Sequence, residues 1–209
     1  GQALMHWDIK NLQTAVHVEG TLNNPNDKDR YWSVEIAIPF QSLMKFGTRK
    51  TPRLDSYWRM NFSRVQWQYQ LENGQYIRKK ENQKLLPEDN WVWSPIGLIN
   101  MHYPERWGYI YFTADTIINS YPASYHAERT AWNIHYLQQI HRNKELQYAA
   151  ELSSLDGYAE FLREDLKNFD VQITVDADKS FYRVSLKEKN STYFFTIDNH
   201  GNYTTNYEQ

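Results

Sequence analysis

The chain has 209 residues, of which 41% are hydrophobic and 16% aromatic, and its net charge of −2 argues against the basic surface of a general nucleic-acid binder. It contains no cysteine, which excludes disulfides and cysteine-ligated metals, and no apolar run near the ~20 residues that span a membrane. Residues 1–113 hold 14 basic and 11 acidic side chains, whereas residues 114–209 hold 9 and 14. This division of charge predicts two parts with different surfaces.

The first predicted elements are two strands separated by a polar turn. The chain starts at Gly1 in place of Met, which we interpret as a processed or engineered start. Residues 12–20 indicate a strand that ends at a glycine, and the Asn-, Asp- and Pro-rich residues 22–30 indicate a turn. Residues 31–38 alternate apolar and polar side chains, which is typical of a half-buried strand. On this pattern Trp32 is expected to lie in the core.

Further along, the sequence predicts more β-structure joined by long loops. Residues 41–46 favour one helical turn, and residues 57–67 favour a strand that carries Trp58 on the same face as other apolar side chains, so this tryptophan is expected in the core. Polar residues 70–90 are expected to be irregular. Short strands are expected at 91–95 and 108–113, and Trp107 is expected to pack against a turn.

The last part of the chain has a different pattern. Apolar side chains at near-helical spacing predict a helix from about Ser120 to Glu145, and a second helix is expected at 158–167. Three strands are expected at 170–176, 180–187 and 191–197, and residues 199–202 suit a hairpin turn that requires a positive φ. We therefore expect domains at 1–115 and 116–209, the second being a small α+β domain.

Several segments of the first part resemble the second half of a family-nine-like carbohydrate-binding domain over about residues 7–113. These segments are DIKNLQTAVHVEGTLNNPNDKDRYWSVEIAIPF, YWRMNFSRVQW and ENQKLLPEDNWVWSPIGLINMHYPERWGYIYF. The resemblance implies an antiparallel β-sandwich of jelly-roll type. It also implies a secreted, periplasmic or cell-surface protein of the kind found in polysaccharide-degrading Bacteroides-type bacteria. More loosely, the tail resembles the helix-then-sheet arrangement of pilin headgroups.

The resemblance also implies a sugar site. Family members clamp a sugar ring between two tryptophans, one of which lies in a late loop that corresponds to residues 90–95, so Trp91 and Trp93 are the candidates. The family's first half, which supplies the other tryptophan, is expected to be missing from this chain. A sandwich without half of its strands exposes sheet edges and an apolar face, so we expect self-association or a partner that supplies the missing half.

The residue types near these tryptophans suit a glycan ligand. Trp91 and Trp93 lie two positions apart and share one face of a strand, where they either form a flat platform or pack inside the protein. A platform buries the C–H face of a sugar ring, and polar side chains beside it bind the hydroxyl groups. Arg64, Gln66 and His102 are candidates for that second task.

Metal binding and catalysis have weaker signals. Asp27 and Asp29 offer oxygen ligands for a structural calcium ion, although a solvated turn is the simpler interpretation. No other cofactor is expected. Glycoside hydrolysis requires two facing carboxylates, and no spacing in the sequence pairs any. We therefore expect non-catalytic carbohydrate binding. The alternatives are an accessory subunit of a glycoside hydrolase and a structural or interaction domain whose aromatic side chains are all in the core.

Overall fold

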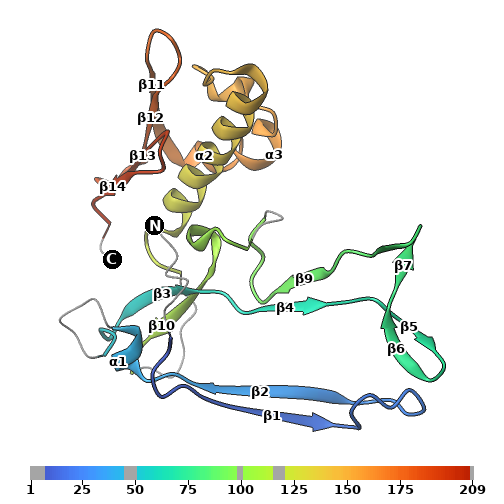
Figure 1. Ribbon diagram of the computed structural model, residues 1–209. Coiled ribbons are helices and arrows are strands. Elements are labelled where there is room, and N and C mark those ends of the chain that lie inside the picture. The colour runs from blue at the N-terminus through green and yellow to red at the C-terminus, as the bar shows by residue number, and fades with distance from the viewer. Residues whose placement is uncertain (1–7, 45–50, 98–100, 115–120, 208–209) are drawn as a thin grey trace. The chain divides into compact units, whose positions relative to one another are not determined.

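The computed structural model describes residues 8–44, 51–97, 101–114 and 121–207. The chain divides into unit one, Gly1–Ala114, and unit two, Asp115–Gln209. Strands account for 36% of the described residues and helices for 21%, so the described part of the protein is mainly β with antiparallel sheets, as the sequence predicts (Figure 1). No helix in the described part of the chain is both long enough and apolar enough to cross a membrane.

Unit one is built from pairs of antiparallel strands. Among its described residues, backbone hydrogen bonds join β1 with β2, β3 with β10, β4 with β9, β5 with β6 and β7 with β8. The bounds are β1 Gln13–Glu19, β2 Tyr31–Ala37, β3 Ser56–Met60, β4 Ser63–Gln66, β5 Tyr69–Glu72, β6 Gln75–Arg78, β7 Lys80–Glu81, β8 Lys84–Leu85, β9 Asp89–Val92 and β10 Gly108–Phe112. The short helices are α1 Phe40–Leu43 and the 3-10 turn η1 Pro104–Arg106.

The hairpin β1–β2 has one apolar face that remains exposed. Val16 lies opposite Val34 and Val18 lies opposite Trp32, so these side chains share a face, while His17 and Glu35 lie on the other. The strand prediction is confirmed, but the prediction of burial is wrong, because Trp32 is 51% exposed. Alternation shows which side chains share a face, and here the described residues leave that face about half exposed.

The strand predicted at 57–67 is two strands, because the chain changes partner at residues 61–62. β3 pairs with β10, where Met60 lies opposite Gly108, and β4 pairs with β9, where Ser63 lies opposite Val92. Trp58 is half-buried and makes an edge contact with Phe112, with ring centroids 5.0 Å apart.

Residues 69–85 form two hairpins, so the prediction of an irregular segment at 70–90 is wrong. Asn73 and Gly74 connect β5 to β6 with φ values of 51° and 77°, as a two-residue hairpin turn requires. Asn82 and Gln83 also have positive φ between β7 and β8. The sequence prediction missed these strands because they are only two to four residues long and lie among many polar side chains, although Tyr69, Leu71 and Tyr76 share one face of β5–β6.

Unit one has very little interior. Ile96 is the one buried hydrophobic residue among those described in this unit. Large apolar side chains on β1, β2, β4, β5 and β9 are exposed instead. The antiparallel pairs therefore do not close over a shared core within the described residues.

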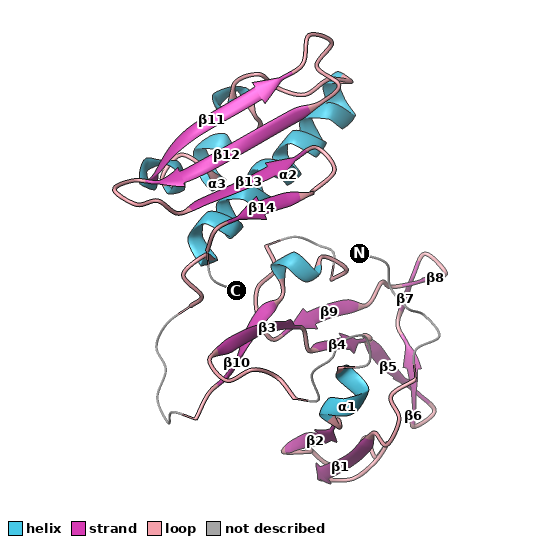
Figure 2. Cartoon of the chain, turned by 90° about the vertical axis from the view of Figure 1, so that its left-hand side faces the viewer, coloured by secondary structure: helices cyan, strands magenta, loops and turns pink. Residues whose placement is uncertain are grey.

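Unit two is a helix packed on an antiparallel meander. Its elements are α2 Tyr125–Glu145, η2 Leu152–Ser154, α3 Tyr158–Phe161, η3 Asp165–Asn168, β11 Phe169–Val175, β12 Tyr182–Glu188, β13 Phe194–Asp198 and β14 Tyr203–Thr205. The four strands pair in chain order, and α2 lies against one face of their sheet (Figure 2). The other face carries more polar side chains, such as Arg183 and Lys187 of β12.

The core of unit two follows from helical and strand periodicity. Ala127, Ala131 and Ile134 lie on one face of α2 and are at most 1% exposed. They belong to one cluster with Val184 and Phe195 of the sheet. The small alanines let the helix approach the strands closely, and the polar face of α2 is left to solvent.

Two sequence predictions for unit two need correction. The second helix, expected at 158–167, consists of the short α3 and the 3-10 turn η3. The short strand β14 was not predicted, because three mostly polar residues carry no apolar alternation. The turn before β14 agrees with the prediction, since Gly201 has a φ of 77°.

Candidate functional site

An aromatic groove, groove A, lies over β2, β4 and β9 of unit one. Its volume is about 690 Å³, which is within the range of small-molecule sites. It is lined by Trp32, Val34, Ile36, Phe62, Ser63, Arg64, Trp91, Val92 and Trp93. Three indoles therefore line one open groove, although Trp32 is far from Trp91 and Trp93 in the chain.

Arg64 occupies the middle of groove A. It lies opposite Trp91 across the β4–β9 ladder, so both side chains extend from the same face. The Arg64 guanidinium carbon is 5.5 Å from the ring centroid of Trp91 and 6.0 Å from that of Trp32, both within cation–π range. No salt bridge joins it to a carboxylate of the described residues. Its N–H donors are thus available at a flat aromatic surface.

Trp93 is held in a fixed orientation at the edge of groove A. Its Nε1 donates a hydrogen bond to the Met60 carbonyl at 3.0 Å, and its ring meets Phe62 edge-on with centroids 5.5 Å apart. Gly108 lies against the ring, because a Cβ atom at that position would be 2.6 Å from Trp93 Cζ2. The side chain is nevertheless 48% exposed, so one part of a pre-oriented indole faces solvent.

The degree of exposure separates the two interpretations of these tryptophans. Trp91 is 59% exposed, and Trp93 and Trp32 are about half exposed. Trp107 differs, since it is half-buried and donates from Nε1 to the Met101 carbonyl at 2.7 Å, as a side chain packed on a turn would. Clustered exposed indoles are typical of an interaction surface.

The structure brings together some of the predicted site residues and not others. Trp91, Trp93 and Arg64 line groove A, whereas Gln66 and His102 do not. Gln66 extends from β4, and its amide donates to the Trp67 carbonyl at 3.1 Å. His102 is exposed in the turn before η1. The residue that the sequence prediction missed is Trp32, since its alternating pattern indicated a core strand.

The two candidate metal ligands lie in the loop between β1 and β2. Asp27 Oδ2 accepts a hydrogen bond from Thr21 Oγ1 at 2.6 Å, and Asp29 Oδ1 accepts one from the Thr21 amide at 2.8 Å. Within the described residues, no group of three or more His, Cys, Asp or Glu side chains could hold a metal ion. These contacts are those of a hydrogen-bonded turn, and calcium binding stays a prediction.

Two of the groups in unit two with clearly shifted pKa values, Tyr182 and Asp198, illustrate how its fold causes such shifts. Burial, together with nearby Tyr148 and Asp198, raises the pKa of Tyr182, whose hydroxyl lies 2.8 Å from His135 Nδ1. Burial alone would raise the pKa of Asp198, but hydrogen bonds from Asn202 and the His200 amide outweigh it and lower the pKa. Both are explained by packing and turn geometry, without a ligand.

Comparison of the chain with protein-family models, with curated proteins and with solved structures found no match. A fold alone does not specify a function, so the geometry of groove A is the basis for the function of this chain. The groove combines three half-exposed indoles, an accessible guanidinium and an apolar floor from β2.

Proposed function

We propose that unit one binds carbohydrate without catalysis, by stacking sugar rings on the indoles of groove A. The observation that carries this proposal is that Trp32, Trp91 and Trp93 line one groove together with Arg64, whose guanidinium lies within cation–π distance of Trp32 and Trp91. The ligand is a glycan or oligosaccharide, and the protein serves polysaccharide capture or degradation.

The chemistry of a sugar ring matches the two parts of groove A. One face of the ring presents C–H groups, which an exposed indole such as Trp91 removes from water at small entropy cost. The ring also carries hydroxyl groups in its plane, and Arg64 offers five N–H donors in a fixed planar arrangement. A binding surface for a flat amphipathic ring requires both features side by side.

The lining of groove A favours binding over hydrolysis. Glycosidases use two carboxylates about 5–5.5 Å or 6.5–9.5 Å apart on either side of the scissile bond. Among the described residues that line groove A there is no aspartate or glutamate. Association with a glycoside hydrolase as an accessory module is compatible with the same site.

The resemblance to the second half of a family-nine-like carbohydrate-binding domain supports the proposal. Under it, unit one is part of a jelly-roll β-sandwich in a secreted, periplasmic or cell-surface protein.

The proposal is tested by isothermal titration of the 209-residue protein against a panel of neutral and uronic-acid sugars. Trp91→Ala is expected to weaken binding about tenfold or more, because ring stacking contributes area burial plus about 0.5–1.5 kcal/mol and about 1.4 kcal/mol is a tenfold change. The matched control is Asn90→Ala, since Asn90 lies on the opposite face of β9 and outside groove A. Absence of heat with every sugar would refute the proposal.

A protein-interaction surface is the second candidate function. It is favoured by the apolar face of β1–β2, where Val16 is 68% exposed and Ile36 is 52% exposed. Edges and faces of this kind drive self-association or pairing with another chain. Light scattering of the purified protein across a concentration series distinguishes the candidates: a stable dimer in which Trp91 becomes protected from fluorescence quenchers favours interaction.

A further inference from the structure

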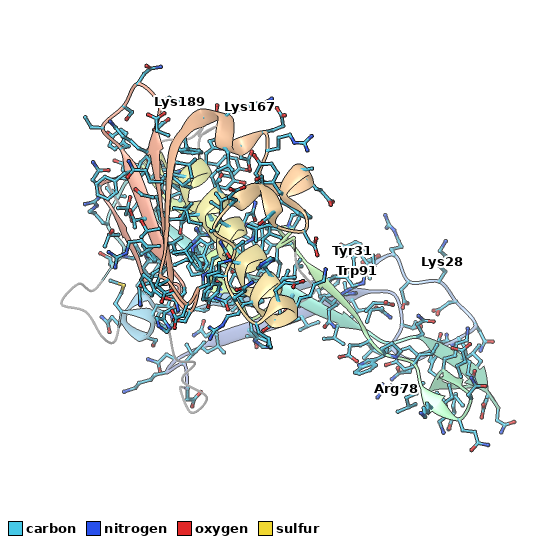
Figure 3. All side chains as sticks on the ribbon, turned by 90° about the horizontal axis from the view of Figure 1, so that it is seen from above. Lys28, Tyr31, Arg78, Trp91, Lys167 and Lys189 are labelled. Carbon is cyan, nitrogen blue, oxygen red and sulfur yellow. The ribbon has the colours of Figure 1, made fainter. Side chains whose placement is uncertain are left out.

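A second groove, groove B, adjoins groove A in unit one. Its volume is about 950 Å³, and its walls come from the β1–β2 hairpin with its loop, from Arg64 of β4, and from the β5–β6 hairpin. Trp32 and Arg64 line both grooves. Figure 3 labels Tyr31, which lines groove B, and Trp91, which lines groove A. The two grooves therefore meet at one indole and one guanidinium.

One wall of groove B is aromatic. Leu71 lies opposite Tyr76 and Tyr69 lies opposite Arg78 in the β5–β6 ladder, so both tyrosines are on the same face of the hairpin. Their rings meet edge-on with centroids 6.3 Å apart, and each is nearly half exposed. The tight turn at Asn73–Gly74 fixes this register, which places two tyrosine rings toward one groove.

The loop between β1 and β2 lines groove B mainly with polar side chains. These include Asn23, Asn24, Asp29 and Arg30. The Asp29 carboxylate is oriented by the Thr21 amide at 2.8 Å, and the loop ends where the Arg30 amide donates to the Glu19 carbonyl at 2.9 Å. Amide, carboxylate and guanidinium groups of both charges suit the hydroxyl groups of a sugar better than a uniformly charged polymer.

We propose that grooves A and B form one continuous binding cleft for a linear oligosaccharide. This proposal rests on the proposed carbohydrate function of groove A. One end of the chain stacks on Trp91 and Trp93. The chain passes Trp32 and Arg64 and continues between Tyr69, Tyr76 and the β1–β2 loop. Each groove has the volume of a complete small-ligand site, so a single sugar ring would occupy only part of the cleft.

The first test is the dependence of affinity on chain length. The 209-residue protein is titrated with oligosaccharides of increasing length, from the monosaccharide upward, in glucose, xylose, mannose and galacturonic-acid series. A continuous cleft predicts a rise of at least about tenfold between the shortest and longest bound members of a series, because each further ring that stacks on an aromatic side chain adds binding energy.

The outcomes of this titration separate the two proposals. Binding with the same affinity at every length would overturn the continuous cleft and leave carbohydrate binding by groove A standing. Absence of binding at every length in every series would overturn both.

The second test removes the walls of groove B. The double variant Tyr69→Ala, Tyr76→Ala is expected to abolish the gain in affinity with chain length. The single variant Arg30→Ala, which leaves the β5–β6 hairpin intact, is expected to have the same effect. The control is Gln70→Ala, because Gln70 lies on the opposite face of that hairpin and outside groove B. An undiminished length gain in both wall variants would refute the second subsite.

Discussion

Gln138 supports the interior of unit two through two hydrogen bonds that are fully shielded from water. The side chain is 0% exposed on α2, and its Nε2 donates to the Ala149 carbonyl at 2.9 Å. Its Oε1 accepts from the Ala149 amide, also at 2.9 Å. Because Ala149 is 5% exposed, water cannot replace either partner. Gln138 thereby connects the segment after α2 to the helix through hydrogen bonds.

The substitution Gln138→Leu removes both hydrogen bonds and keeps the approximate size and helix propensity of the side chain. A buried backbone group without a partner costs about 1–3 kcal/mol. For two such groups we expect a loss of about 2–5 kcal/mol in the free energy of unfolding, since burial of the leucine offsets part of the cost. In a domain of this size, this corresponds to a fall in melting temperature of about 10 °C or more.

Thermal and urea unfolding are followed by far-ultraviolet circular dichroism, because α2 dominates the helical signal of the described residues. Asn143→Leu is the control: it makes the same amide-to-leucine change at an exposed position of α2 and should alter stability by at most about 0.5 kcal/mol. If Gln138→Leu is no less stable than this control, the two hydrogen bonds do not hold the segment after α2, and the reasoning is wrong.

Three further predictions concern the site and the pH dependence of stability. Gly108→Ala places a Cβ against the Trp93 ring, so it should cost about 1–3 kcal/mol in unfolding free energy and weaken sugar binding; unchanged titration and melting curves would contradict this. Arg64→Lys keeps the charge but loses the planar guanidinium, so calorimetry should show weaker sugar binding than in the wild type, and equal affinity would indicate that charge alone matters. The lowered pKa of Asp198 means that its contribution to stability is complete above the unfolded pKa of about 3.9 and is lost as the pH falls through the lower folded value. Asp198→Asn should therefore flatten the loss of stability below about pH 4 in melts at a series of pH values; an unchanged slope would rule out that contribution.

Local patterns in the sequence were sufficient for most of unit two. The apolar spacing along α2 predicts both the helix and its buried face, which includes Ala131 and Ile134. The alternation in β12 predicts the strand and its inward side chains. In this unit each apolar face is covered by a neighbouring element, so periodicity and burial agree. The exception is β14, which is too short to show alternation.

Unit one shows where such patterns fail. Alternation places Trp32 with Val34 and Ile36 on one face of β2, and that part is correct. Burial depends on whether another layer fully covers this face, and the described residues cover it only in part, which leaves Trp32 51% exposed. Residues 69–85 fail in the opposite way, because their strands are short and largely polar, and the alternation at 69–72 and the Asn73–Gly74 turn were the available signals.

The sequence by itself predicted the division into a β-rich first part and an α+β tail, the faces that apolar side chains share, and Trp91, Trp93 and Arg64 among five candidate site residues. Only the tertiary structure decided that these three meet Trp32 in groove A, and that groove B continues past it. The physical reason is that side-chain alternation is a local property of a strand. The pairing of β4 with β9, and the approach of β2 to both, depend on contacts between segments far apart in the chain.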